Sequence, residues 1–298
     1  MNGEPATAAT SRWRFERLDS VSAPGRSVNE DRASATAQAA WVIDGVTGLS
    51  SQRLFPGPSD AAWLAAAADA SLHDLADFAG DGHALLRQVT ARLRQESARA
   101  ALRSLDEAGL DLPAASVAVA RLSGDDLETT MLSDCKILLG HRGGTVTALD
   151  QSPVAPFDAA VVAALRALRA QGETRLSDVT PRLQAIIRDN RRWVNKPGGY
   201  GVLSADPAGL AFVEVRRWPA ADVTHVLLAS DGFYRLVDTY RVLEPKDLLR
   251  NAVAGGLAPL YAELRRIEAA DSECLAHPRL KPQDDATALL LQVIPPPH

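Results

Sequence analysis

Short apolar runs far apart in the chain each have a carboxylate at one edge. An apolar run of about four to eight residues beside turn-forming residues is typical of a buried strand. A carboxylate at the end of such a strand is costly to bury unless a cation or hydrogen bonds offset its charge. The chain is therefore expected to form strands whose ends gather acidic side chains. The acidic positions are Glu30-Asp31 in GRSVNEDR, Asp44 in WVIDGVTG, Asp231 in VLLASDGF and Asp284-Asp285 in QDDATALLLQV.

Three of these positions are expected to meet at one rim of a sheet. Asp44 and Asp231 each end an apolar run and precede a glycine, which allows a tight turn and close approach of a backbone carbonyl to a ligand. Asp284 opens the last run, and in neighbouring antiparallel strands the end of one lies beside the start of the next. Ligands that are all oxygen indicate a hard divalent cation such as Mg²⁺ or Mn²⁺. The simpler alternative is that each aspartate is an ordinary turn residue at a strand end.

Composition and charge exclude several other classes of protein. A net charge of −5 over 298 residues gives no general basic field for nucleic acid. The most apolar stretch, residues 61–80, contains Asp69, His73, Asp74 and Asp77 and does not suit a membrane span. No apolar secretory segment follows the N-terminus, and two cysteines form no disulfide framework. We expect a cytoplasmic protein that binds neither nucleic acid nor membrane.

The order of predicted elements favours an α+β fold with largely antiparallel sheets, because paired strands alternate with paired helices. One domain is expected over residues 13–294, between a disordered tail of residues 1–12 and a short tail of residues 295–298. Turns at 124–126 and 142–144 separate short strands between residues 115 and 149. Further strands are predicted at 13–18, 39–43, 210–215, 225–230 and 286–294. Helices are predicted at 60–78, 84–108, 158–170, 178–194, 245–254 and 257–270.

The acidic motifs, taken in order, resemble those of the type 2C (PPM) family of metal-dependent serine/threonine phosphatases. The motifs are RSVNEDR, WVIDGVTG, LSDCKILLG, LLASDGFYRLVD and DDATALLL, and the resemblance spans about Arg26 to Val293. It implies a four-layer α-β-β-α sandwich, with two mainly antiparallel sheets flanked by helix pairs. It also implies hydrolysis of phosphoserine or phosphothreonine in proteins by direct attack of a metal-bound water or hydroxide on phosphorus.

Roles carry over from the family position by position. Asp44 would bridge two divalent ions, Mn²⁺ or Mg²⁺, with the Gly45 carbonyl as a further ligand. Asp231 and Asp284 would complete the shell of the first ion. The resemblance assigns the second ion to Glu30 and Asp31, directly or through water, a weaker third ion to Asp134 with Asp231, and the substrate phosphate to Arg26, whose planar guanidinium suits that anion.

Two departures from the family pattern affect the expected chemistry. The family often carries Asp-Gly-His-Gly-Gly, whose histidine is a candidate proton donor, whereas this chain has Asp44-Gly45-Val46-Thr47-Gly48. Valine donates no proton, which puts turnover of poor leaving groups in doubt. Residues 133–136, Ser-Asp-Cys-Lys, replace the usual Gly-Asp-Ser-Arg and make the third metal site less certain than the first two.

Other functions remain as alternatives. A pseudophosphatase or phosphoprotein-binding regulatory module with little turnover would fit Val46, and a small-molecule phosphatase could use the same fold, since loops set the substrate. A cysteine phosphatase is disfavoured, because Arg142 lies one residue too far from Cys135 for a Cys-x5-Arg loop. The expected partners are a phosphorylated protein substrate and a cognate Ser/Thr kinase system.

Overall fold

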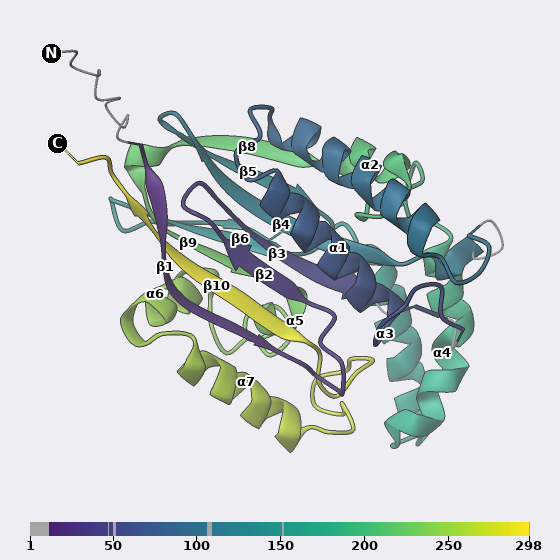
Figure 1. The fold of residues 1–298 in the computed structure, drawn as a ribbon. Coiled ribbons are helices and arrows are strands. Elements are labelled where there is room, and N and C mark those ends of the chain that lie inside the picture. Colours follow the sequence, from purple (N-terminus) through teal and green to yellow (C-terminus); the bar gives the residue numbers. More distant parts are fainter. Residues whose placement is uncertain (1–11, 47, 50–51, 106–108, 151, 298) are drawn as a thin grey trace, which may run out of the picture.

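The protein is described from a computed structural model that covers residues 12–46, 48–49, 52–105, 109–150 and 152–297. The expected tails, residues 1–12 and 295–298, therefore lie outside the described residues except for Arg12 and residues 295–297. Within these ranges, ten strands form two antiparallel sheets, and helices cover both outer faces (Figure 1). No helix in the described ranges is long and apolar enough to cross a membrane.

Sheet I has the strand order β1-β10-β9-β6-β7. Its central strands are buried on both faces, since one face meets the other sheet and the opposite face meets helices. This explains their nearly continuous apolar runs. The strands of sheet I are β1 (Arg14–Ala23), β6 (Lys136–His141), β7 (Val146–Leu149), β9 (Val223–Ala229) and β10 (Ala286–Ile294).

Sheet II has the strand order β2-β3-β4-β5-β8. The turn from β4 to β5 passes through Gly124, whose φ of 61° favours glycine. The two sheets pack face to face around an apolar core that includes Val42, Ala118, Ile137 and Leu289. The strands of sheet II are β2 (Arg32–Ala35), β3 (Ala39–Val46), β4 (Ala114–Ser123), β5 (Asp126–Leu132) and β8 (Glu214–Pro219).

Helix pairs complete the four layers. Helices α1 (Asp60–Asp74) and α2 (Gly82–Ala100) cover sheet II around the buried Trp41, and α6 (Pro245–Gly255) and α7 (Ala258–Ala270) cover sheet I. Figure 1 shows the two pairs on opposite sides of the strands. The expected α+β sandwich of two antiparallel sheets flanked by helices is confirmed.

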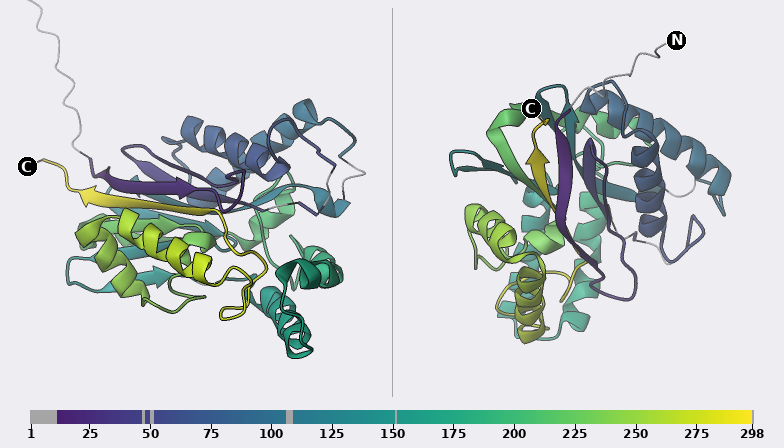
Figure 2. Two further views of the ribbon diagram at one scale, coloured as in Figure 1. Left: turned by 90° about the horizontal axis from the view of Figure 1, so that it is seen from below. Right: turned by 60° about the vertical axis from the view of Figure 1, so that its left-hand side comes forward.

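A third helix pair lies at one end of the sandwich. Helices α3 (Ala155–Ala170) and α4 (Leu176–Arg191) pack on each other around Val161, Leu165 and Val179 rather than on the face of a sheet. Figure 2 shows them projecting from the end opposite the start of β1 and the end of β10. Several loops that carry the acidic residues lie beside this pair.

Some predicted element boundaries were wrong. In place of a strand at 210–215, the chain forms a 3-10 helix, η2 (Pro207–Phe212), followed by β8. Asp206 and Pro207 explain the difference, because the Asp206 carboxylate accepts a hydrogen bond from the Ala208 amide and proline suits a first helical position. Helices α1 and α2 end earlier than predicted, at Asp74 and Ala100, and β2 was not predicted. The remaining elements are η1 (Gly109–Asp111), η3 (Ala220–Asp222) and α5 (Asp231–Tyr234).

Candidate active site

Asp44 and Gly45 lie within β3, two residues and one residue before its end at Val46, rather than in a turn after it. Asp44 is opposite Ser116 of β4 in the register of sheet II. A Cβ on Gly45 would lie 2.6 Å from the Glu30 carbonyl oxygen, so only glycine allows the 26–31 loop to approach this closely. Sheet II therefore delivers one carboxylate and packs the Glu30 backbone against it.

Asp231 and Asp284 come from the other sheet. Asp231 opens α5 two residues after the end of β9, and Asp284 lies two residues before β10. Strands β9 and β10 are antiparallel neighbours, as Ala229 pairs with Ala288, so the end of one meets the start of the other. The predicted single rim is corrected to the shared end of two sheets, because Asp44 belongs to sheet II.

Gly232 is required where β9 turns into α5. A Cβ on Gly232 would lie 1.9 Å from the Asp285 carbonyl oxygen, which leaves no room for any side chain. Ser230 beside it donates its amide to the Thr287 carbonyl oxygen at 2.9 Å, and the Thr287 amide donates to Ser230 Oγ at 3.0 Å. These contacts fix Asp231 relative to the segment that carries Asp284.

Asp285, the second residue of the last acidic pair, holds the loop that contains Arg26. Its Oδ1 accepts a hydrogen bond from the Gly25 amide at 2.8 Å, and its Oδ2 accepts from the Glu30 amide at 2.6 Å. Arg26 is itself exposed, and it lines a small cleft of about 150 Å³ together with Glu30 and Asp284. The structure thus brings the predicted phosphate ligand beside two of the predicted metal ligands.

Asp31 is almost completely buried, with 1% of its surface exposed. Neither carboxylate oxygen has a well-formed hydrogen bond within the described residues. Burial raises the pKa of Asp31 to about 7, although the nearby Thr287 and Ser230 side chains favour the charged form. A buried carboxylate without a well-formed hydrogen bond is costly, so this position suits a carboxylate that faces a cation.

Asp134 lies in the turn between β5 and β6. Ser116 Oγ accepts hydrogen bonds from the Asp134 amide at 2.8 Å and the Cys135 amide at 2.6 Å, which fixes the turn beside β4. Ser133 has a φ of 75°, a left-handed conformation that explains why glycine is usual at this position in the family. Burial and Asp231 raise the pKa of Asp134 to about 6, against the effect of Lys136.

Asp44 lies at the electrostatic centre of the acidic residues. Burial raises its pKa well above the usual value of 3.8, and four neighbouring carboxylates raise it further, in the order Asp31, Asp231, Asp134 and Asp284. Yet within the described residues no three His, Cys, Asp or Glu side chains converge as a ready-made group of metal ligands. The carboxylates lie near enough to repel one another without meeting at a single point.

Asp284 faces two cations. Its Oδ2 accepts from Arg235 Nη2 at 2.5 Å, and its Oδ1 accepts from Lys281 Nζ at 2.9 Å. Burial alone would raise the pKa of Asp284, but Lys281 and Arg235 hold it below the usual value of 3.8. Neither cation was predicted to belong to the site. The sequence offered a signal for Lys281, because it is one of only four lysines in the chain and lies three residues before Asp284.

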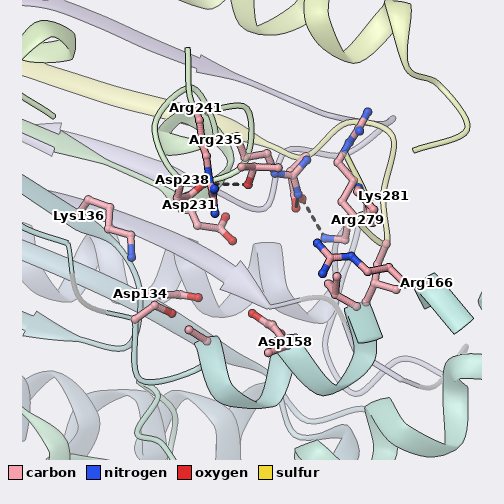
Figure 3. A pocket seen from close by; sticks show the side chains of 18 residues that line it. Asp134, Lys136, Asp158, Arg166, Asp231, Arg235, Asp238, Arg241, Arg279 and Lys281 are labelled. Carbon is pink, nitrogen blue, oxygen red and sulfur yellow. Dashed lines mark hydrogen bonds and ion pairs between the residues drawn. The ribbon is translucent and has the colours of Figure 1, made fainter. Parts of the chain in front are cut away.

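Three clefts meet at these carboxylates. Asp44 lines one of about 270 Å³, beside the apolar side chains of Val46, Phe157 and Val161. The largest, of about 620 Å³, extends between α3 and the loop after α5. Figure 3 shows Asp134, Asp158 and Asp231 pointing into this largest cleft, with Arg166, Arg279 and Lys281 gathered at one end of it.

The residues present fit divalent cations. The donors are carboxylate oxygens from both sheets, as a hard cation prefers, and the buried Asp31 oxygens have no well-formed hydrogen bond in the described ranges. Cys135 is a poor alternative centre of reactivity, because burial and Asp44 raise the pKa of its thiol well above the usual value. Both cysteines are free, as expected.

The family comparison agrees with the four-layer fold. Residues 25–272 match the family model of protein phosphatase 2C, and the chain belongs to that family. The expected family resemblance is thereby confirmed. No significant match was found among curated proteins.

Solved structures with the same fold are bacterial phosphatases of low sequence identity. The Mycobacterium tuberculosis serine/threonine phosphatase PstP/Ppp is 17% identical, with a TM-score of 0.52 and coverage of 94% of this chain and 98% of that one. PppA of Pseudomonas aeruginosa is 16% identical, with a TM-score of 0.52 and coverage of 95% and 99%. Stp1 of Staphylococcus aureus is 11% identical, with a TM-score of 0.51 and coverage of 99% of both chains.

Proposed function

We propose that this protein is a metal-dependent phosphatase that hydrolyses phosphoserine and phosphothreonine in proteins. The observation that carries the proposal is the electrostatic coupling of Asp44, from sheet II, to Asp231 and Asp284, from sheet I, in a chain of the protein phosphatase 2C family. Several buried carboxylates this near to one another favour the binding of cations among them, because a cation offsets their repulsion. The site also opens into clefts large enough for a peptide side chain.

The proposed metal ligands follow the family pattern. Asp44, the Gly45 carbonyl, Asp231 and Asp284 would hold a first Mn²⁺ or Mg²⁺, and Asp44 with Glu30 and Asp31 a second. Asp134 with Asp231 would hold a weaker third. A PstP catalytic domain has been solved in complex with two manganese ions, which supports a two-metal site here by analogy. Bound divalent ions would neutralise the phosphate and activate a water for direct attack on phosphorus.

The remaining work falls to side chains of this chain. Arg26, exposed on a loop tied down by Asp285, would bind the phosphate with its guanidinium. Val46 lines the cleft beside Asp44 and supplies no proton, so the leaving alkoxide would take its proton from solvent. The proposed substrate is a protein phosphorylated by a Ser/Thr kinase, whose action this enzyme would reverse.

Substitution of the central carboxylates tests the proposal. Asp44→Asn and Asp231→Asn should each lower Mn²⁺-dependent release of phosphate from a phosphothreonine peptide by about a thousandfold or more, because each removes a charge that the transition state requires. Asp77→Asn is the matched control, since Asp77 is exposed between α1 and α2, away from the site. Unchanged turnover in both variants would refute the proposal.

The same experiment separates the main alternative. A phosphoprotein-binding module with little turnover is favoured by Val46 and by the two cations already paired with Asp284. Wild-type protein that binds Mn²⁺ in calorimetry but hydrolyses neither p-nitrophenyl phosphate nor phosphopeptides would support that alternative. Hydrolysis of p-nitrophenyl phosphate without any peptide preference would instead favour a small-molecule phosphatase.

A further inference from the structure

The cations around the carboxylates differ in how firmly they are held. Arg235 is nearly buried, with 11% of its side chain exposed, and lies between Asp284 and the buried Glu268 of α7, with Nη1 3.3 Å from Glu268 Oε1. Arg279 is fixed by Asp271 and by backbone carbonyl oxygens, including that of Pro282. Both arginines are therefore parts of the framework, because their donors are committed to buried acceptors.

Lys281 is held far less firmly. Its side chain is 35% exposed, and Asp284, three residues away, is the partner of Nζ within the described residues. A partly exposed ion pair between residues three apart contributes little stability. The ammonium group sits on a flexible four-carbon chain and can exchange one oxygen acceptor for another at low cost.

Lys281 also has an unusual position. It lines all three clefts that meet at the site: the small cleft with Arg26, the cleft with Asp44, and the large cleft with Asp134 and Asp231. Arg26 lines only the small one of these three. A phosphate placed over Asp44 and Asp231 would therefore lie beside Lys281 whichever cleft it entered by.

The local charge creates a need for such a cation. A phosphate dianion would approach Asp44, Asp134 and Asp231, which line the same cleft of about 270 Å³. Like charges at this spacing disfavour binding unless cations lie between them. Lys281 lines this cleft together with Asp44 and Asp231, and its Nζ lies 2.9 Å from Asp284 Oδ1, so the ammonium lies among the carboxylates rather than at their edge.

We propose that Lys281 is a second phosphate-binding cation, which pairs with Asp284 in the free protein and transfers to the phosphate of the substrate or product. This assignment rests on the proposed phosphatase function, since it names a further ligand of the same substrate group. It gives Asp284 two competing partners, Lys281 and a divalent cation. Removal of the ammonium should therefore weaken phosphate binding without weakening metal binding.

Calorimetry with two probes tests the assignment on the full chain. Inorganic phosphate is titrated into Mg²⁺-loaded wild type, Lys281→Met, Lys281→Arg and the control Lys246→Met, an exposed lysine of α6. Lys281→Met loses one charge-assisted hydrogen bond, so its phosphate affinity should be about tenfold lower than that of the wild type. The phosphate affinity of Lys281→Arg should lie within about threefold of the wild type. Titration of Mg²⁺ alone should give Lys281→Met an affinity equal to wild type or tighter.

The outcomes separate the possible roles of Lys281. Phosphate affinity that is unchanged in Lys281→Met would overturn the proposal and leave the lysine as a counter-ion of Asp284. A parallel loss of phosphate and Mg²⁺ affinity, with a lower melting temperature, would also overturn it and indicate a structural role. If Lys281→Met does not fold, Lys281→Gln is compared with Lys281→Arg, and equal phosphate affinities of these two would refute the assignment.

Failure of the proposed function gives a different result. Binding of phosphate needs no turnover. If the wild type hydrolyses no phosphopeptide, and Lys281→Met binds phosphate more weakly than the wild type, the phosphatase function is refuted and the Lys281 site is retained. Normal hydrolysis with no effect of Lys281→Met on phosphate affinity would do the reverse.

Discussion

The aspartates of the candidate active site have the same side chain but lie in three different surroundings. Asp31 is buried with no well-formed hydrogen bond in the described part of the chain, Asp284 is paired with Arg235 and Lys281, and Asp285 accepts two backbone hydrogen bonds. The first arrangement destabilises the charged form and the other two stabilise it. The role of each carboxylate is therefore set by its neighbours.

Asp31 gives a pH-dependent prediction for metal-free protein. Burial raises its pKa from 3.8 to about 7, so between these pH values the folded state binds more protons than the unfolded state. The free energy of unfolding should therefore fall as pH rises from about 4 to about 7. Asp31→Asn removes this loss and should stabilise the metal-free protein at pH 8 by up to about 4 kcal/mol.

Urea denaturation in EDTA at pH 4 and pH 8 measures the effect of Asp31→Asn. At pH 4 the wild-type carboxyl is already protonated, so the two proteins should have nearly equal stability. A stability difference that is the same at both pH values would contradict burial of a charge as the cause.

At the scale of elements, the junction between β9 and α5 positions Asp231 by excluding side chains. Gly232 lies against the backbone that leads into β10. Ser230, the residue two before it, donates one hydrogen bond to Thr287 and accepts another from it. The glycine that follows this aspartate in the sequence therefore serves packing. No positive φ is involved at this position.

Gly232→Ala is predicted to destabilise the protein by at least about 2 kcal/mol, because the added methyl group would lie 1.9 Å from the Asp285 carbonyl oxygen. Phosphatase activity should fall as well, because the shift of backbone that the methyl group forces would also move Asp231 away from Asp284. Gly143→Ala in the β6–β7 turn is the matched control: its Cβ would meet nothing within 4 Å. Equal unfolding midpoints for the two variants in urea would show that the junction can relax.

At the scale of the whole molecule, the candidate active site joins the two sheets. Sheet II contributes Asp44. In sheet I, Asp231 follows β9 and Asp284 precedes β10, so cations bound among the three residues would connect both halves of the sandwich. Helices α3 and α4 border this end with a separate apolar cluster of their own. Metal binding is thus expected to stabilise the entire fold rather than one loop.

Mn²⁺ should raise the melting temperature of wild-type protein by about 5 °C when present at about a hundred times its dissociation constant. Asp44→Asn should show less than about half of this rise, because the substituted residue faces both halves of the site. Differential scanning calorimetry with and without Mn²⁺ measures the shift, with Asp77→Asn as control. A full shift in Asp44→Asn would place the metal elsewhere.

Much of the fold followed from local sequence. The last strand was predicted at its observed bounds, 286–294, because its apolar run is long and enclosed by Asp285 and Pro295. Helix α1 was predicted to begin at residue 60, where it does begin; Ser59 is its N-cap, with Oγ accepting a hydrogen bond from the Ala62 amide. These features were predictable because their causes lie within a few residues of one another.

The sequence by itself determined which residues carry charge at the ends of buried strands, and hence the family and the candidate ligands. Only the tertiary structure decided that Asp44 comes from a different sheet than Asp231, that Asp285 anchors the Arg26 loop, and that Lys281 and Arg235 face Asp284. The physical reason is range. Strand periodicity and capping depend on near neighbours, whereas the pairing of charges depends on residues brought together by packing from far apart in the chain.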